Sequence, residues 1–258
     1  MPTALITGAS SGLGEQFAYA LARQKHDLVL VARRADRLEM VSARSKELGA
    51  GRVEIMAMDL GQRATPQTIC DRLKRDQIEI HYLVNNAGFG TAGRFSQLAL
   101  ARELEQIDLN ITALVSLTHL LLPAMIERHS GTIINVASTA AFQSVPYMTT
   151  YAATKAFVLS FTEGLAGELA GSGIRVMALC PGPVRTEFQA VAQNERAVLP
   201  SFVWVPAEKV VADGIAAAAS GRMTYIAGAL NFFTVQSTRF VPRAMINFIA
   251  RRVYKPVE

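Results

Sequence analysis

The 258-residue sequence has only two cysteines, Cys70 and Cys180, and no CxxC pair. Two such thiols cannot build a disulfide framework, so a reduced environment is the default expectation. The four histidines show none of the spacings that bind metals, and we expect no metal site. Chemistry based on a thiol pair or on a protein-bound metal is therefore not indicated.

Long apolar runs and blocks of like charge are also missing. No uninterrupted apolar stretch reaches the length of a membrane span, and the N-terminus lacks the basic and apolar regions of a cleavable signal peptide. The net charge is only +5, and the basic residues are dispersed except near the C-terminus, which argues against a nucleic-acid partner. Together these absences favour a cytoplasmic protein.

Half of the residues are hydrophobic, so either the core is large or apolar surface contacts a partner or a lipid. Short apolar runs alternate with stretches of helical period, and no linker or tandem repeat interrupts them. This pattern predicts an α/β fold: a single Rossmann-type, doubly wound domain over residues 1–258, with a seven-stranded parallel sheet flanked by helices on both faces. The expected strands are Ala4–Thr7, Asp27–Ala32, Arg52–Met58, His81–Asn85, Gly131–Ala137, Arg175–Leu179 and, more weakly, Thr224–Ile226.

A glycine-rich loop joins the first expected strand to a helix expected over Gly12–Gln24. Glycine lets backbone N–H groups approach a phosphate, and a helix N-terminus favours its negative charge. The loop is therefore a candidate site for a dinucleotide pyrophosphate, although its spacing is G-x-x-x-G-x-G and a strand-to-helix turn without a ligand would look the same. The candidate residues are Gly8, Ser10, Ser11, Gly12, Leu13 and Gly14.

Two arginines follow the second expected strand. An acidic residue at this point would bind the adenine ribose 2′-hydroxyl of NAD, but the chain has Ala32 followed by Arg33 and Arg34. Guanidinium groups suit a 2′-phosphate because they carry a permanent charge and paired donors. We therefore expect NADP (NADPH) rather than NAD; the alternative is that both arginines only face solvent.

Further candidate cofactor residues follow the next two strands. Asp59, which precedes Leu60, could accept a hydrogen bond from the adenine amino group. Asn86, Ala87 and Gly88 stand where the chain turns away from the sheet, beside the crevice in which such folds bind their ligands.

Tyr151 and Lys155 are four residues apart in a segment of helical period, and Ser138 precedes them after the fifth expected strand. Residues i and i+4 share one face of a helix, so both side chains can point into one site. Such a pair can move a proton while a nicotinamide moves a hydride. Standing alone, the same spacing is commonly an accident of an amphipathic helix. Tyr147 has no lysine four residues later and is expected only to line the pocket.

Six motifs occur in order over residues 7–186: TGASSGLG at 7–14, NNAG at 85–88, Asn110, NVAS ending at Ser138, YAATK at 151–155 and PGPVRT at 181–186. With these motifs the sequence resembles the short-chain dehydrogenase/reductase family. The resemblance implies a seven-stranded parallel sheet and a nicotinamide-dependent oxidoreductase. The last third matches loosely, and in the family that region forms the substrate pocket.

The resemblance also implies a role for each matching residue. Tyr151 is the general acid in reduction and the base in oxidation. The ammonium of Lys155 and the positive nicotinamide of the oxidised cofactor lower the pKa of Tyr151, and Lys155 also binds the nicotinamide ribose. Ser138 hydrogen-bonds the substrate oxygen, and Asn110 holds a water that relays protons through Lys155 to solvent. The residues implied to lie along the nicotinamide are Pro181, Gly182, Val184 and Thr186.

One position departs from the family pattern. Some members that use NADP also carry a basic residue within the glycine loop, where this chain has Ser10 and Ser11. The preference for NADP therefore depends mainly on Arg33 and Arg34, and use of both cofactors stays open.

Two segments follow the last motif. Residues 187–215 are expected to form a substrate lid, and their aromatic residues, among them Trp204, favour an apolar carbonyl or alcohol substrate or else ordinary core packing. Residues 231–258 mix phenylalanines with arginines, and Pro242 could open a helix there. This basic amphipathic segment could contact a membrane surface, cap the pocket or pack on a neighbouring subunit.

The segment 151–170 is apolar or small on nearly every side, which predicts a helix buried by the sheet and by a second copy, as a homodimer or homotetramer. The alternative is a deeply buried helix in a monomer.

The sequence as a whole predicts an NADP(H)-dependent oxidoreductase for an apolar ketone, aldehyde or secondary alcohol. The alternative is a nucleotide-binding redox sensor, but a sensor does not need the acid–base pair Tyr151 and Lys155.

Overall fold

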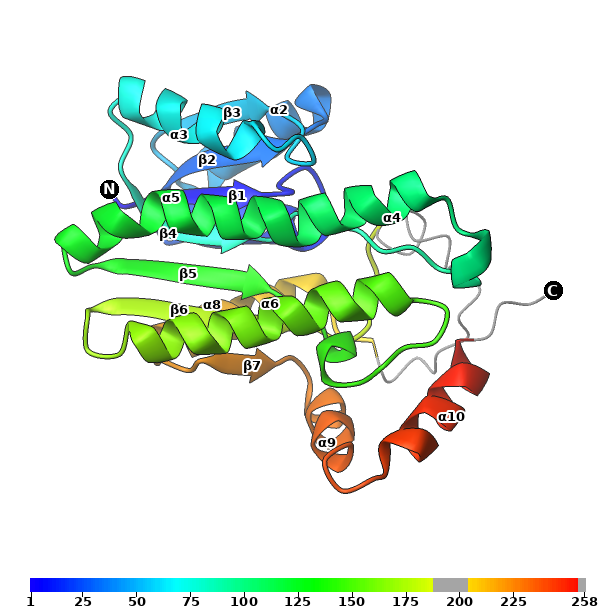
Figure 1. The fold of residues 1–258 in the computed structure, drawn as a ribbon. Coiled ribbons are helices and arrows are strands. Elements are labelled where there is room, and N and C mark those ends of the chain that lie inside the picture. Colours follow the sequence, from blue (N-terminus) through cyan, green and yellow to red (C-terminus); the bar gives the residue numbers. More distant parts are fainter. Residues whose placement is uncertain (188–203, 255–258) are drawn as a thin grey trace.

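The computed structural model describes residues 1–187 and 204–254. Seven parallel strands form one sheet in the order β3-β2-β1-β4-β5-β6-β7 (Figure 1). The strands are β1 (Thr3–Thr7), β2 (Asp27–Ala32), β3 (Val53–Ala57), β4 (Ile80–Asn85), β5 (Gly131–Val136), β6 (Ile174–Cys180) and β7 (Thr224–Ile226). The predicted Rossmann-type, doubly wound fold is confirmed, and the strand ends differ from the expected ones by at most one residue.

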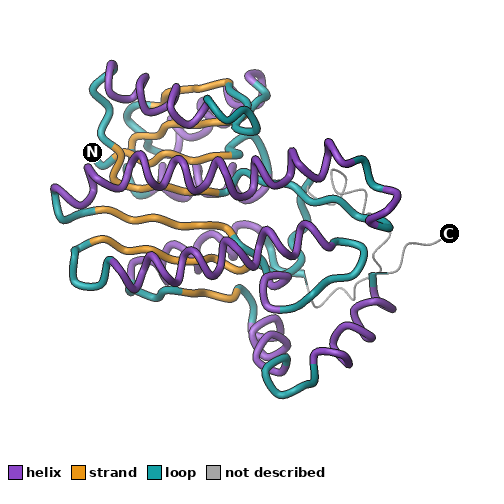
Figure 2. The backbone as a smooth tube through the Cα atoms, viewed as in Figure 1, coloured by secondary structure: helices purple, strands orange, loops and turns teal. Residues whose placement is uncertain are grey.

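Helices cover both faces of the sheet, as Figure 2 shows. One layer contains α1 (Gly12–Arg23), α2 (Ala35–Leu48) and α8 (Ala207–Ala219). The opposite layer contains α3 (Thr65–Arg75), α5 (Ala113–Glu127) and α6 (Thr149–Glu168).

Both faces of each central strand are buried, which explains why the strands are apolar at nearly every position. Successive strand residues point to opposite faces. In β1, Ala4 and Ile6 join the core that contains Phe17 of α1, whereas Leu5 joins the core that contains Leu117 of α5. A continuous apolar run is therefore the correct pattern for a strand in this fold.

The strand order reverses between β1 and β4, where successive connections leave to opposite faces of the sheet. Thr7 joins the ends of these two strands, because its hydroxyl donates to Val84 O at 3.2 Å and accepts from the N–H groups of Asn86 and Ala87 at 2.9 and 3.0 Å. Ligands of doubly wound folds bind at such a switch point, beyond the carboxyl ends of the strands.

A continuous helical rod runs over residues 100–127 and consists of α4 (Leu100–Ile107), a π-helical turn η2 (Asp108–Thr112) and α5. By length and mean hydropathy alone this rod could cross a membrane, although polar residues such as Asn110 and His119 interrupt its apolar run. In the structure α5 lies along the sheet (Figure 1), and its buried residues include Leu114 and Leu117. A core helix meets the same test of length and composition.

The helix expected over residues 151–170 is α6, but it is not buried on every side. Its inner face, which includes Val158 and Thr162, is fully buried, whereas Ala153, Phe157 and Gly164 are exposed. A Cβ atom built on Gly164 would have no neighbour within 4 Å. The small and apolar outer face is therefore open within one chain.

The expected lid over residues 187–215 is wrong in its second half, and residues 188–203 lie outside the described part of the chain. α8 begins at Ala207, and its Val210 and Val211 are fully buried with α1 in the core. Trp204 lies before this helix and does reach the cavity described below. The remaining short turns are η1 (Phe95–Gln97) and η3 (Thr139–Phe142).

Two helices at the C-terminal end, α9 (Ala229–Ser237) and α10 (Arg243–Val253), extend away from the sheet beyond β7 (Figure 1). Pro242 caps α10, so the helix begins one residue later than expected. Asn247 of α10 donates to Ser144 Oγ at 3.2 Å, which ties the helix back to the loop before α6. Residues 255–258 of the predicted basic segment lie outside the described residues.

Candidate active site

A cavity of about 1040 Å³ opens beyond the carboxyl ends of the strands. The structure brings nearly all the predicted site residues to its wall; Gly14 and Asn110 are the exceptions among them. We call the part next to α1 and β2 the glycine-loop end and the part next to β5 and α6 the Tyr151 end. The predicted residues that line it are Gly8, Ser10, Ser11, Gly12, Leu13, Arg33, Arg34, Asp59, Leu60, Asn86, Ala87, Gly88, Ser138, Tyr151, Lys155, Pro181, Gly182, Val184 and Thr186.

The glycine loop packs so tightly that side chains would not fit. Gly8 and Gly12 have φ angles of 65° and 60°, which favour glycine. A Cβ atom on Gly14 would stand 2.2 Å from Gly8 O and 2.6 Å from Asn86 Nδ2. Gly14 therefore permits the close contact between α1 and the loop, and it does so without lining the cavity.

The loop also leaves donors for an anion. Ser11 is the N-cap of α1 but makes no side-chain cap hydrogen bond. The first N–H groups of a helix have no partner within the helix, and its N-terminus carries a partial positive charge. This arrangement, with bare glycine backbone beside it, fits a dinucleotide pyrophosphate.

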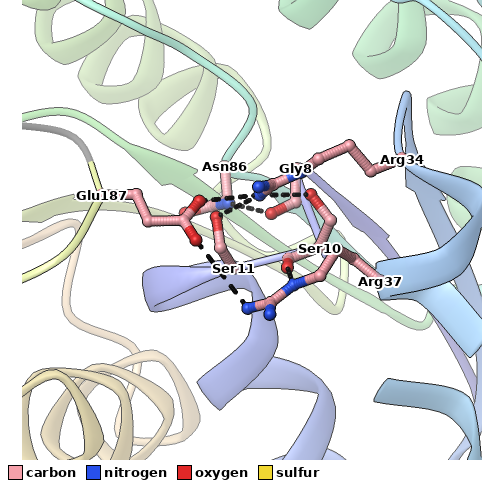
Figure 3. A network of polar contacts seen from close by, with 7 residues as sticks. All are labelled: Gly8, Ser10, Ser11, Arg34, Arg37, Asn86 and Glu187. Carbon is pink, nitrogen blue, oxygen red and sulfur yellow. Dashed lines mark hydrogen bonds and ion pairs between the residues drawn. The ribbon is translucent and has the colours of Figure 1, made fainter. Parts of the chain in front are cut away.

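Arg34 lies at the edge of the glycine-loop end, and its guanidinium donates to Ser10 Oγ at 3.2 Å and to Ser11 Oγ at 3.0 Å (Figure 3). It also forms an ion pair with Glu187 at 2.8 Å. Arg37, which the sequence analysis missed, pairs with the same carboxylate at 3.8 Å and donates to Ser10 O at 3.5 Å. Its position three residues after Arg34, where α2 begins, was the available signal.

Asp59 and Asn86 are used partly to hold the backbone. Asp59 accepts from the Gly61 N–H at 3.0 Å, and its own carbonyl accepts from Thr65 Oγ1 at 2.7 Å. Asn86 Nδ2 donates to Thr7 O at 2.9 Å and to Gly8 O at 3.3 Å. Both residues therefore shape the cavity wall as well as line it.

Ser138, Tyr151 and Lys155 meet at the Tyr151 end. Tyr151 and Lys155 lie one turn apart on α6 and are 9% and 5% exposed. The Lys155 ammonium donates to Val136 O at 2.8 Å and lies 5.9 Å from the centre of the Tyr151 ring. A hydrogen bond joins the side chains of Ser138 and Tyr151, and Ser138 Oγ also accepts from the Ala140 N–H at 3.1 Å. The hydroxyl groups of a serine and a tyrosine thus converge beside a buried ammonium.

Burial controls the protonation of both groups. It raises the pKa of Tyr151 to about 12, against a smaller opposite effect of the hydrogen bond from Ser138. It lowers the pKa of Lys155 to about 8, with Cys180 acting in the opposite direction. In the protein by itself burial therefore outweighs any effect of Lys155 on the pKa of Tyr151; the lowering expected with a positive nicotinamide stays a prediction. At neutral pH Tyr151 is therefore protonated and Lys155 is largely charged in the protein by itself.

Asn110 lies in the π-helical turn between α4 and α5 and is fully buried. Its Oδ1 accepts from the Phe89 N–H at 3.1 Å, and its Nδ2 donates to Phe89 O and to Thr154 Oγ1, both at 3.0 Å. The side chain therefore joins the loop after β4 to α6, next to Lys155. The predicted relay water stays a prediction, because these contacts occupy both ends of the amide.

The PGPVRT segment crosses the middle of the cavity wall. Pro181 O accepts from the Thr139 N–H at 2.8 Å, which fixes the segment to the turn that begins at Ser138. A Cβ atom on Gly12 would stand 3.2 Å from Thr186 Cβ. The segment thus connects the Tyr151 end with the glycine loop. This position is in keeping with the prediction that it lies along a nicotinamide.

The apolar part of the wall was only partly foreseen. Met148 and Val145 line the cavity, as do Trp204 and Tyr254. Tyr147 was also predicted to line the cavity, and this prediction is wrong. Its φ angle of 67° places it in a turn, and its carbonyl oxygen accepts from the Gly93 N–H at 2.8 Å.

Tyr254, just after α10, packs near Tyr151 and Met148. Its position supports the prediction that the C-terminal segment caps the pocket. No local pattern in the sequence indicates this contact, because Tyr254 and Tyr151 lie about a hundred residues apart in the chain.

Comparisons with known proteins agree with this geometry. The sequence profile of the short chain dehydrogenase family matches residues 2–197. A short-chain dehydrogenase from Sphingobium yanoikuyae, solved in complex with NADPH, is 35% identical, with a TM-score of 0.83 and coverage of 93% of this chain and 94% of that one. A bulky-bulky ketone specific alcohol dehydrogenase from Comamonas testosteroni is 31% identical, with a TM-score of 0.78 and coverage of 93% and 92%. Serine 3-dehydrogenase of Rhizobium radiobacter is 37% identical over 83% of this chain and 84% of its own length.

Proposed function

The chain belongs to the short-chain dehydrogenase family, and from this premise we propose that it is an NADP(H)-dependent oxidoreductase for an apolar ketone, aldehyde or secondary alcohol. One observation carries the proposal: Ser138, Tyr151 and Lys155 share a cavity with a glycine loop shaped for a pyrophosphate. A bound nicotinamide would supply or accept the hydride. The residues of the chain bind the substrate oxygen and move its proton.

In the reducing direction Tyr151 donates the proton of its hydroxyl to the carbonyl oxygen of the substrate, which becomes an alcohol. Ser138, already hydrogen-bonded to Tyr151, donates to the same oxygen as negative charge develops on it. Lys155 places a positive charge 5.9 Å from the centre of the tyrosine ring, which stabilises the phenolate that remains after the proton has left. In oxidation the same groups act in reverse, with Tyr151 as the base.

NADP(H) is the proposed cofactor because Arg33, Arg34 and Arg37 follow the carboxyl end of β2 at the outer edge of the glycine-loop end, where β2 ends in Ala32 and not in an acidic residue. The relative from Sphingobium was solved with NADPH, and serine dehydrogenase, 29% identical, was solved with NADP+. The apolar substrate is proposed from Val145, Met148, Trp204 and Tyr254 at the Tyr151 end. A relative specific for bulky ketones is in keeping with such a wall.

The activity test is NADPH and NADH oxidation against a panel of apolar ketones and aldehydes, with the Tyr151→Phe and Tyr147→Phe variants alongside. We expect turnover with NADPH in the wild type and in Tyr147→Phe, and a loss of about a thousand-fold in Tyr151→Phe. Tight NADPH binding without any turnover in the wild type would favour the alternative, a redox sensor.

The open outer face of α6 supports a homo-oligomer, as a homodimer or homotetramer. Phe157 is 41% exposed and stacks on Phe161 with 6.0 Å between ring centres, beside the bare backbone of Gly164. A second copy would bury this face by close helix packing. We expect Phe157→Glu to shift the molar mass measured by light scattering toward the monomer; a monomeric wild type would contradict the proposal.

We also propose a cytoplasmic protein that touches an anionic membrane surface through α9 and α10. Residues 229–254 hold four arginines and no acidic residue. They also carry exposed aromatic residues, including Phe240, which is 87% exposed, and Phe233. Co-sedimentation with phosphatidylserine vesicles tests this: Phe240→Asp should reduce binding, and equal binding to neutral vesicles would contradict it.

A further inference from the structure

Glu187 faces the arginines of the glycine-loop end from the opposite wall of the cavity. Its Oε2 atom lies 2.8 Å from Arg34 and its Oε1 atom lies 3.8 Å from Arg37, so the carboxylate bridges both guanidinium groups (Figure 3). Glu187 and Arg34 are 153 residues apart in sequence and both line the cavity. Glu187 is therefore the acidic residue that the end of β2 lacks, supplied by another part of the chain.

A 2′-phosphate and the Glu187 carboxylate need the same donors. Both are anions with two or more oxygens, and both suit the paired N–H groups of a guanidinium. Arg34 also donates to the hydroxyl groups of Ser10 and Ser11. A phosphate that approached this cluster would meet a negative charge already on the arginines.

We propose that Glu187 sets cofactor selectivity: its carboxylate competes with the 2′-phosphate of NADP(H) for Arg34 and Arg37, and so limits the preference over NAD(H). This inference depends on the proposed function, which places the adenosine end of the cofactor at Arg34. NAD(H) has no 2′-phosphate and meets no such competition, so Glu187 acts on one cofactor and not on the other.

The exposure of the pair sets the size of the effect. The side chains of Arg34 and Glu187 are 45% and 48% exposed. Ion pairs exposed to this degree are weak, so a phosphate can displace the carboxylate. Removing the charge of Glu187 should therefore tighten NADPH binding about three- to five-fold.

The experiment measures dissociation constants for NADPH, NADH and the fragment 2′,5′-ADP by fluorescence and calorimetric titration. The variants are Glu187→Gln, which keeps the size of the side chain, and Glu187→Ala as a second removal of the charge. Glu47→Gln is the matched control, because Glu47 forms a somewhat more exposed pair of the same kind with Arg44 at 2.6 Å on α2, away from the cavity. Thermal unfolding of each variant shows that it is folded.

The inference expects both Glu187 variants to bind NADPH and 2′,5′-ADP about three- to five-fold more tightly, with NADH and the control unchanged. Unchanged NADPH affinity, or parallel changes for NADPH and NADH, would overturn it. Arg34→Gln separates the two proposals. If Arg34→Gln loses the preference for NADPH while Glu187→Gln has no effect, the cofactor proposal stands and the proposed role of Glu187 is wrong. If the wild type and Arg34→Gln both bind NADPH and NADH with equal affinity, the cofactor proposal and the role of Glu187 are both wrong.

Discussion

At the glycine-loop end of the cavity, the charged side chains of Arg34 and Glu187 are about half exposed, whereas at the other end the side chains of Tyr151 and Lys155 are buried. Water screens the first set, so its contacts are weak and exchangeable. Burial moves the pKa of Tyr151 upward and the pKa of Lys155 downward. One cavity therefore combines a solvated site suited to selecting a charged ligand with a desolvated site suited to moving a proton.

The largest effect is expected from removing a polar group at the buried end. Ser138→Ala removes the donor to the substrate oxygen and should lower kcat by about a hundred- to a thousand-fold. The dissociation constant of NADPH should stay within about two-fold, because Ser138 lies at the end remote from Arg34. Steady-state kinetics and nucleotide titration check this, and an equal loss in both quantities would show that the two ends are not separate.

Lys155 provides a pH test of burial. The unfolded chain keeps the lysine proton up to an ordinary pKa of 10.5, whereas the folded chain loses it near 8. The unfolded state binds more protons between these values, so the free energy of unfolding contributed by Lys155 rises with pH from about 8 to 10.5. Urea unfolding measures this. Between pH 7.5 and pH 10, the free energy of unfolding of the wild type should rise relative to that of Lys155→Met by on the order of 2 kcal/mol.

The exposed Lys209 supplies the control for this pH test. It pairs with Asp213 at 2.9 Å, and the pair raises its pKa instead of lowering it. The free energy of unfolding of the wild type should therefore not rise relative to that of Lys209→Met over this pH range. If the difference in free energy of unfolding between wild type and Lys155→Met does not change with pH over this range, the Lys155 ammonium is solvated in the folded protein.

The smallest of these effects is expected at the solvated end. Arg34→Gln removes a guanidinium from a 2′-phosphate and should raise the dissociation constant of NADPH about ten-fold. NADH binding and the kcat of saturated enzyme should change little. Arg44→Gln, on the same helix and outside the cavity, is the control, and a large fall in kcat would contradict the division between the two ends.

Local sequence determined most of the fold and a large part of the site. A strand buried on both faces must be apolar along its length, so the seven strands could be placed within a residue. The glycine loop and the Tyr151–Lys155 pair need residues at fixed short spacings, and short spacings are visible in a sequence. These are constraints of backbone geometry and of helix period.

Tertiary structure alone decided the contacts between distant segments and the solvation of each group. It brought Glu187 to Arg34 and Arg37, and Tyr254 to the Tyr151 end. It left the outer face of α6 open within one chain, because a helix on one sheet has one covered face, and burial of the outer face by a second copy stays a prediction. It also set the pKa of Tyr151, which burial raises in the protein by itself, because desolvation depends on the atoms that surround a group and not on its neighbours in sequence.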